Sequence, residues 1–337
     1  MLHIERMDTN LMTDSVPINV LEEPAGTFSD QVINLDLNVL GKPVRLRIGI
    51  KDQQARLADI VPVARILSSK IVQAKMDQLD VVGKSIPCQK GCAACCHTPV
   101  MLSVPEAIYL VESLTARVPP RQCAYFKESC DRVSGQIETY LPRDVFPSDV
   151  TRVSTSELDR FSDWYANSGL SCPFLFSDLC AIYGHRPIAC RECFVIGPAS
   201  QCQIDKASAI VKTIQGALSL RNVLMRLTSE LTQADREGIL MHNVFSWYKQ
   251  YKEVLRRRWP AGMMVERFIS IVKALADRDN TIRAEQGNRE VKRSPGLQIL
   301  DIRGENLPGR PFHRSQVCFE GTDGTGLRRF RAREAET

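Results

Sequence analysis

The sequence has no long hydrophobic run. No window approaches the roughly 18–20 consecutive apolar residues that a membrane span requires, so we expect no membrane partner. The N-terminal residues 1–10 also lack the basic segment followed by an apolar stretch that marks a secretory signal. We therefore expect a cytoplasmic protein.

Neither sign of charge is in excess. The 337 residues include 44 Lys and Arg against 39 Asp and Glu, a net charge of +5. This balance predicts no nucleic-acid partner. The basic run Leu327–Arg333 indicates a solvated tail, with contact to RNA or acidic lipid as the minority alternative.

Signatures of common enzymes are absent as well. The five histidines are scattered, and none stands in a recognisable nucleophile motif. The one glycine-rich stretch, Gly321–Gly326, follows no convincing strand, so it does not predict a nucleotide-binding turn.

Cysteine, by contrast, is abundant. Of twelve cysteines, ten lie between Cys88 and Cys193, Cys202 follows closely, and Cys318 stands alone in the tail. A reducing cytosol keeps thiols reduced, so this density predicts metal binding and not a disulfide framework. The dense segments are Cys88–His97 and Cys172–Cys202, each with the short spacings at which two thiolates can reach one ion.

The adjacent pair Cys95 and Cys96 indicates more than one metal ion. Neighbouring side chains diverge by about 100° on a helix, so they are poorly placed to chelate a single ion. Two ions or one polynuclear cluster would use both thiolates more naturally. We expect Lys90, Arg186 and Arg191 to offset the thiolate charge and to donate hydrogen bonds to sulfur.

Several other residues are open to different interpretations. Cys123 and Cys130 are seven apart on an apolar helical face, which favours core packing. Cys193 completes a C-x-x-C pair with Cys190, so a thiol redox protein is an alternative. His97 and His185 lie within the cysteine-rich segments, and whether they or Cys193 ligate metal is left open.

The hydrophobic periodicity predicts a mainly α-helical fold with an irregular, cysteine-rich metal-binding core and a small N-terminal antiparallel β-hairpin. Helical spacing begins near Gln53, where Pro62 should start or kink a helix, and Ser103–Glu106 has the form of a capping box. The expected segments are a disordered leader (1–28), a single globular domain (29–280) containing the hairpin (31–51), the metal-binding core (86–202) and C-terminal helices (205–277), and a flexible basic tail (281–337).

Over roughly residues 60–225 the chain resembles the YkgJ-type cysteine-cluster family, a zinc- or iron-chelating domain with a C-x-x-x-C-x-x-C-C signature. The matching elements are Cys88-x3-Cys92-x2-Cys95-Cys96, Cys172-Pro-Phe-Leu, Cys180-Ala-Ile-Tyr, Arg186-Pro-Ile-Ala-Cys190-Arg-Glu and Cys202. The resemblance implies that zinc or iron, including an iron–sulfur cluster, is ligated by Cys88, Cys92, Cys95, Cys96, Cys172, Cys180, Cys190 and Cys202.

The function expected from this resemblance is a metal-binding protein whose site is structural, sensory or metal-handling. The alternative is an iron–sulfur enzyme, a protein lysine N-methylase related to the flagellin lysine methylases, which carry a similar cysteine signature. The sequence leaves open whether the protein is an enzyme, and it indicates no particular protein partner.

Overall fold

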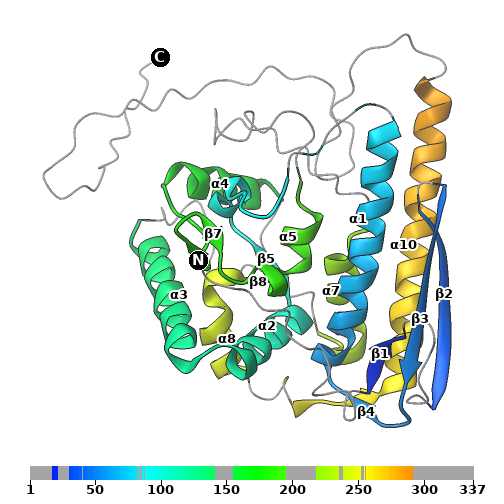
Figure 1. Cartoon of the computed structure of the whole chain (residues 1–337), viewed down its shortest axis with the longest axis horizontal. Helices are drawn as coiled ribbons and strands as arrows, with labels where there is room; N and C mark the ends of the chain where they lie inside the picture. The colour runs from blue at the N-terminus through cyan, green and yellow to red at the C-terminus, as the bar shows by residue number, and fades with distance from the viewer. Residues whose placement is uncertain are drawn as a thin grey trace, which may run out of the picture. The chain divides into compact units, whose positions relative to one another are not determined.

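The computed structural model is mainly helical, with small antiparallel sheets, as the sequence predicts (Figure 1). It describes residues 17–21, 30–39, 41–81, 83, 86, 88–140, 155–194, 218–234, 238–251, 254 and 256–290. The helices are α1 (Val61–Val81), α2 (Val104–Arg117), α3 (Pro120–Tyr140), α4 (Thr155–Asn167), α5 (Ile188–Glu192), α7 (Leu220–Thr232), α8 (Val244–Gln250) and α10 (Ala261–Glu290). The strands are β1 (Ile18–Val20), β2 (Gln31–Val39), β3 (Lys42–Ile50), β4 (Gln54–Ala55), β5 (Met101–Ser103), β6 (Leu175–Phe176), β7 (Leu179–Cys180), β8 (Gly238–Leu240) and β9 (Trp259–Pro260).

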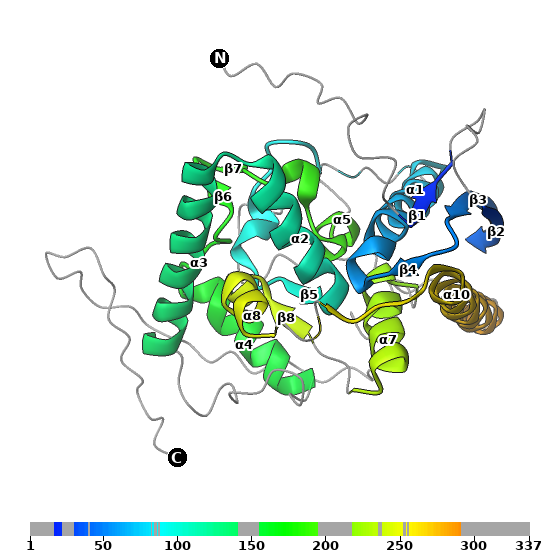
Figure 2. The same cartoon turned by 90° about the horizontal axis from the view of Figure 1, so that it is seen from below.

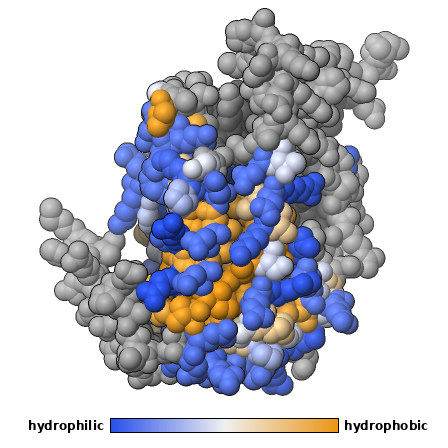
Figure 3. All heavy atoms as spheres, turned by 90° about the vertical axis from the view of Figure 1, so that its right-hand side faces the viewer, coloured by the Kyte–Doolittle hydropathy of each residue, from blue (hydrophilic) through white to orange (hydrophobic). Residues whose placement is uncertain are grey.

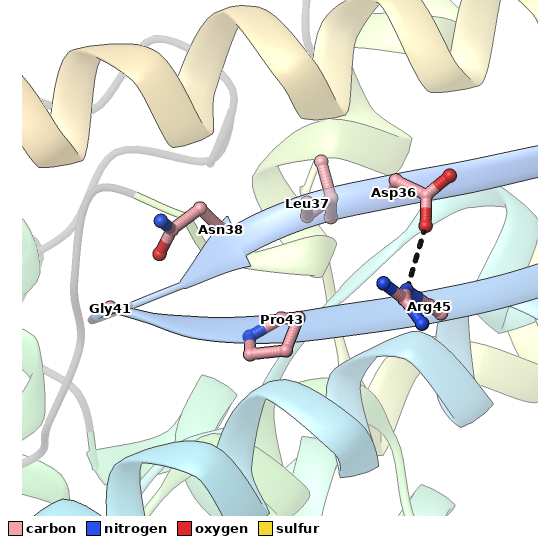
Figure 4. Close-up of a pocket in the computed structure, with 6 residues that line it drawn as sticks. All are labelled: Asp36, Leu37, Asn38, Gly41, Pro43 and Arg45. Atoms are coloured by element: carbon pink, nitrogen blue, oxygen red, sulfur yellow. Dashed lines mark ion pairs between the residues drawn. The ribbon is translucent and has the colours of Figure 1, made fainter.

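The predicted hairpin is confirmed as the antiparallel pair β2–β3. Leu35 lies opposite Leu46, and both are buried, because residues two apart along a strand share one face. On the outer face Asp36 lies opposite Arg45, and their side chains form an exposed ion pair at 3.2 Å (Figure 4). The inner face is therefore free to form a core.

That core joins the hairpin to α1, α7 and α10. Figure 2 shows β2 and β3 beside α10 and α1, in agreement with the contacts between these elements. On the side of the molecule where α10 and the hairpin lie, hydrophobic side chains gather within a hydrophilic border (Figure 3). No helix in the described ranges has the length and hydrophobicity needed to cross a membrane.

Part of the predicted leader is instead structured. Ile18–Val20 forms β1, which pairs with β3 and places Ile18 opposite Ile50. The Ile18 side chain is fully buried. Three residues are too few to display the alternation that identifies a strand, so its pairing depends on an edge supplied by the hairpin. Of the rest of the predicted leader, Pro17 and Leu21 flank this strand, and residues 1–16 and 22–28 lie outside the described ones.

A second core lies around α2, α3 and α8, and α3 and α4 add a smaller one. The helix α1 begins at Val61, so Pro62 lies in its first turn, where its missing N–H costs nothing. The predicted capping box starts α2: the Glu106 carboxylate accepts hydrogen bonds from the Ser103 backbone N–H at 3.1 Å and the Ser103 hydroxyl at 2.7 Å. Cys123 and Cys130 are buried in the second core, as predicted.

The C-terminal helices differ from the prediction in their bounds. Within the region predicted as helices over 205–277, β8 and a short 3-10 helix precede α8, because residues 238–240 pair with β5. The last helix, α10, continues to Glu290, so the first ten residues of the predicted tail (281–337) are helical. The apolar periodicity ends before the helix does, because periodicity reports the buried face and not helical backbone itself. Residues 205–217, and 291–337 of the predicted tail, are outside the described ranges.

Candidate functional site

The first cysteine segment is a tight turn followed by a 3-10 helix. Gly91 has φ +97°, a conformation that glycine adopts without steric cost, and the Cys92 N–H donates to the Gln89 carbonyl at 3.1 Å. The 3-10 helix Ala94–His97 carries the adjacent cysteines, and the Thr98 hydroxyl donates to the Cys95 carbonyl at 2.9 Å. Cys88 and Cys92 are exposed, whereas Cys95 and Cys96 are partly buried.

The second segment is a small hairpin followed by α5. Strands β6 and β7 are joined by Ser177 and Asp178, whose positive φ angles of 47° and 59° are those of a tight two-residue hairpin turn. Cys180 lies on β7 and Cys190 on α5. Cys172, Cys180 and Cys190 all pack against the second core, so this segment is held more firmly than the first.

The structure brings the two segments together through their backbones. The Cys172 N–H donates a 2.6 Å hydrogen bond to the Cys96 carbonyl oxygen. The His97 Nδ1 lies 3.3 Å from the Leu170 carbonyl oxygen. A Cβ atom at Gly91 would lie 3.9 Å from Leu179 Cδ2, which places the first turn against the β6–β7 hairpin. Segments far apart in the sequence are thus neighbours.

The thiols of both segments lie within electrostatic reach of one another. The pKa of Cys95 is lowered, first because the Cys193 thiol hydrogen-bonds to it and then because the Cys96 thiol does so. The pKa values of Cys96 and Cys193 are raised mainly by their hydrogen bonds with Cys95 and by burial. Cys172 and Cys180 add to the shift of Cys96, and Cys190 and Cys88 to that of Cys193. The cysteines linked in this way are Cys88, Cys95, Cys96, Cys172, Cys180, Cys190 and Cys193.

Burial is the main cause of the pKa shifts of Cys172, Cys180 and Cys190. It raises the pKa of Cys172 to about 12, and it raises the pKa values of Cys180 and Cys190 as well. The Cys172 Sγ also lies 3.5 Å from the Met241 sulfur. Buried thiols of this kind stay neutral unless a cation stabilises the thiolate, which is the condition for metal ligation.

In the residues that the structure describes, no three His, Cys, Asp or Glu side chains are already arranged to hold a metal ion. Cys202, the eighth predicted ligand, lies outside the described ranges, as does Cys318. The chemistry of the thiol donors fits zinc or iron, while the side-chain positions do not yet form a site.

The sequence leaves open whether Cys193 ligates metal, and the structure gives this residue a specific neighbour. Its thiol contacts Cys95. The C-x-x-C spacing with Cys190 was the available signal. The contact that the structure forms, however, is with the other segment: Cys190 lies in the middle of α5 and Cys193 is its C-cap.

Two buried carboxylates, those of Glu106 and Glu192, fix the position of α5, the helix that carries Cys190. Glu106 accepts a third hydrogen bond, from the Ile188 backbone N–H at 2.7 Å, and so joins the start of α2 to the start of α5. Glu192 accepts from the Ser68 hydroxyl at 3.1 Å, the Ser219 hydroxyl at 2.7 Å and the Leu220 N–H at 3.0 Å. Burial raises the Glu192 pKa. Neither role is visible in the sequence, because both partners come from distant helices.

The three basic residues that were predicted to offset the thiolate charge differ in their surroundings. The positive charge of Arg186 helps to lower the pKa of Cys95 and opposes the rise in the pKa values of Cys180 and Cys190, as expected of a residue that offsets thiolates. Among the described residues Arg191 donates to oxygen and not to sulfur: its Nε and Nη2 donate to the carbonyl oxygens of Arg186 at 3.0 Å and Gly184 at 3.2 Å. Lys90 is exposed.

The recesses described in the surface lie elsewhere. One, of about 490 Å³, is formed at the hairpin turn by residues that include Asp36 and Arg45 (Figure 4). The other, of about 550 Å³, lies between the hairpin and α1, where Ile66 and Lys70 line it. Neither contains a cysteine or histidine, so we assign no chemistry to them.

No protein-family model matches the chain, and neither the curated proteins nor the solved structures include a significant match. The resemblance to the YkgJ-type cysteine-cluster family therefore depends on the cysteine motifs alone.

Proposed function

We propose that the protein binds zinc or iron, including iron as an iron–sulfur cluster, through the thiolates of the two cysteine segments. The ligands in this proposal are Cys88, Cys92, Cys95, Cys96, Cys172, Cys180, Cys190 and Cys202, in accord with the YkgJ-type signature. The observation that carries the proposal is the 2.6 Å hydrogen bond from the Cys172 N–H to the Cys96 carbonyl, which holds the two segments side by side.

The charges around the thiols support the same proposal. Bringing several thiolates together is costly without a cation, and burial already keeps Cys172 and Cys190 neutral. A metal ion would supply the missing positive charge, and Arg186 would offset the excess negative charge of the ligand set. The proton of each thiol leaves when the metal binds.

The position of the site favours a metal-handling or sensory role over a purely structural one. Among the described residues, the core of the hairpin, α1, α7 and α10 contains none of the proposed ligands, so we expect this part of the fold to form without metal. Cys88 and Cys92 are exposed, so a metal ion could enter and leave from their side.

Metal analysis of anaerobically purified protein tests the proposal. We expect stoichiometric zinc with a colourless protein, or iron with a brown colour and absorbance near 400 nm. Cys172→Ser should remove most of the metal. Cys123→Ala is the matched control, because Cys123 is buried on α3 and belongs to neither segment, so its metal content should equal the wild type. Wild-type protein that takes up neither metal, or a Cys172→Ser variant with full metal content, would contradict the proposal.

A further inference from the structure

Three arginines lie close enough to His185 for their charges to act on it, and a fourth, Arg186, directly follows it in the sequence. Arg65 lies on α1, Arg117 in the last turn of α2, Arg186 just before α5, and Arg191 on α5. The charges of Arg65, Arg117 and Arg191 all act on His185, and burial together with these charges lowers its pKa. Residues of α1, α2 and α5 thus bring like charges toward His185.

Two of these guanidinium groups are in direct proximity. Arg65 Nη2 and Arg191 Nη2 both donate to the single carbonyl oxygen of Gly184, so their positive charges are adjacent. Arg65 Nη1 donates to the Tyr109 hydroxyl at 3.3 Å, and Arg191 Nη1 lies 3.5 Å from the Ser69 hydroxyl. All of these acceptors are neutral. Burial, followed by the charges of Arg65 and Arg186, lowers the pKa of Arg191 to about 10.

No carboxylate compensates this charge within the described ranges. None of Arg65, Arg117, Arg186 or Arg191 forms an ion pair with an Asp or Glu there. The Nδ1 of His185 and the Nε atoms of Arg65 and Arg186 are buried without a hydrogen-bond partner among the described residues. Buried polar nitrogen atoms are rarely left unpaired in folded proteins, so three in one cluster call for an acceptor that the described residues do not supply.

The neighbouring cysteines explain the position of Arg186 but not those of the other three arginines. Arg186 acts on Cys95, Cys180 and Cys190, and its guanidinium carbon lies 3.8 Å from the centre of the Tyr183 ring. Arg191 donates to carbonyl and hydroxyl oxygens, and Arg65 to a carbonyl and a phenol. Arg65, Arg117 and Arg191 are therefore available to a different negative charge.

We propose that Arg65, Arg117, Arg191 and His185 form a binding site for a small dianionic oxyanion, and specifically for a phosphate group. Guanidinium groups present several N–H donors in a planar fork that matches the oxygens of phosphate. Three positive charges suit a dianion better than a single carboxylate. The His185 Nδ1 supplies a further donor in the tautomer that protonates this atom. None of these four residues is among the proposed metal ligands, although Arg191 directly follows Cys190 on α5.

Calorimetric titration of the full-length, metal-loaded protein with inorganic phosphate tests the site, with sodium chloride, sulfate and acetate at equal ionic strength as comparisons. We expect saturable phosphate binding that is at least tenfold weaker in Arg65→Gln and in Arg117→Gln. Arg45→Gln, at an exposed arginine of the hairpin, is the control and should bind phosphate as the wild type does. Arg117 is exposed, so its replacement keeps the test valid if Arg65→Gln does not fold.

Three outcomes of the titration would overturn the proposal. The first is wild-type protein without saturable phosphate binding, and the second is equal binding by wild type and Arg117→Gln. The third is acetate binding as tightly as phosphate, which would show that the cluster does not select a dianion. Metal content, measured on the same samples, should be unchanged in Arg65→Gln. A loss of metal in that variant would mean that the arginines serve the thiolates and would exclude the separate site.

Discussion

The backbone N–H of Cys172 donates to the carbonyl oxygen of Cys96 at 2.6 Å, and this bond links two segments that the sequence separates by α2, α3 and α4. The bond therefore provides a local probe of how strongly the proposed metal holds the segments together.

We predict that removing the metal with a chelator accelerates hydrogen exchange at the Cys172 amide at least tenfold. Structural thiolate–metal bonds contribute on the order of 10 kcal/mol in small zinc-finger peptides, which is comparable to the stability of a whole domain. The first segment has few other attachments, and Cys88 and Cys92 are exposed, so it should separate first. Amides of α1 and α10, in the metal-independent core, should keep their protection.

Exchange mass spectrometry on matched metal-loaded and metal-free samples makes this measurement. Residual metal must be measured in the same sample. Unchanged protection at Cys172 after complete removal would mean that the segments are held by the fold alone and that the metal is an exchangeable ligand.

A second prediction concerns Cys193, whose thiol contacts Cys95. A residue that touches a ligand orients it, and the loss of such a partner typically lowers metal affinity about 10–100-fold. We therefore expect Cys193→Ser to weaken metal retention by at least tenfold in a competition with a chromogenic chelator. Cys130→Ala, which removes a thiol buried in the second core, should retain metal like the wild type. Equal retention by Cys193→Ser and wild type would remove Cys193 from the site.

The sequence predicted those elements whose signals are local. The β2–β3 hairpin follows from alternation at Leu35 and Leu37, and the start of α2 follows from the Ser103–Glu106 capping box. Each depends on residues a few positions apart. Strands β1, β5 and β8 were not predicted, because three residues carry too little pattern and their partners are distant.

The same distinction applies to the candidate site. Cysteine spacing identified the two segments, and the structure places them side by side. The contact between Cys95 and Cys193, and the carboxylate of Glu192 at the start of α7, depend on how α5 packs against α1 and α7. No spacing along the chain encodes that packing, so these features required the structure.

A third prediction follows from the triple hydrogen bonding of Glu106. Glu106→Ala would leave the Ser103 N–H, the Ser103 hydroxyl and the Ile188 N–H without their acceptor. A buried donor left unsatisfied costs about 1–3 kcal/mol, so we expect a loss of about 3 kcal/mol in the free energy of unfolding. Glu106→Gln, which keeps one acceptor oxygen, should lose less. Urea denaturation would show this, with Glu128→Ala on the exposed side of α3 as the near-neutral control.

The outcome also bears on the cysteines, because Glu106 fixes the start of α5 and Cys190 follows on that helix. A Glu106→Ala variant as stable as the wild type would show that water replaces the carboxylate at both helix starts. The positioning of α5 would then depend on apolar packing alone.

The last prediction concerns acid stability and His242, which lies in the 3-10 helix before α8 and is buried. Burial lowers its pKa from 6.5 to about 4. The unfolded chain therefore binds a proton at this residue between about pH 6.5 and pH 4, while the folded protein does not. Since stability falls wherever the unfolded state binds more protons, the contribution of neutral His242 is complete above pH 6.5 and is lost as the pH falls to about 4. The shift corresponds to about 3 kcal/mol in the free energy of unfolding.

We expect the free energy of unfolding of His242→Gln to decline less steeply between pH 6.5 and pH 4 than that of the wild type. Urea denaturation of both proteins would measure this, with metal-free samples so that protonation of metal ligands does not contribute. Parallel pH profiles for the two proteins would show that His242 is solvated or protonated in the folded state, contrary to its position in the structure.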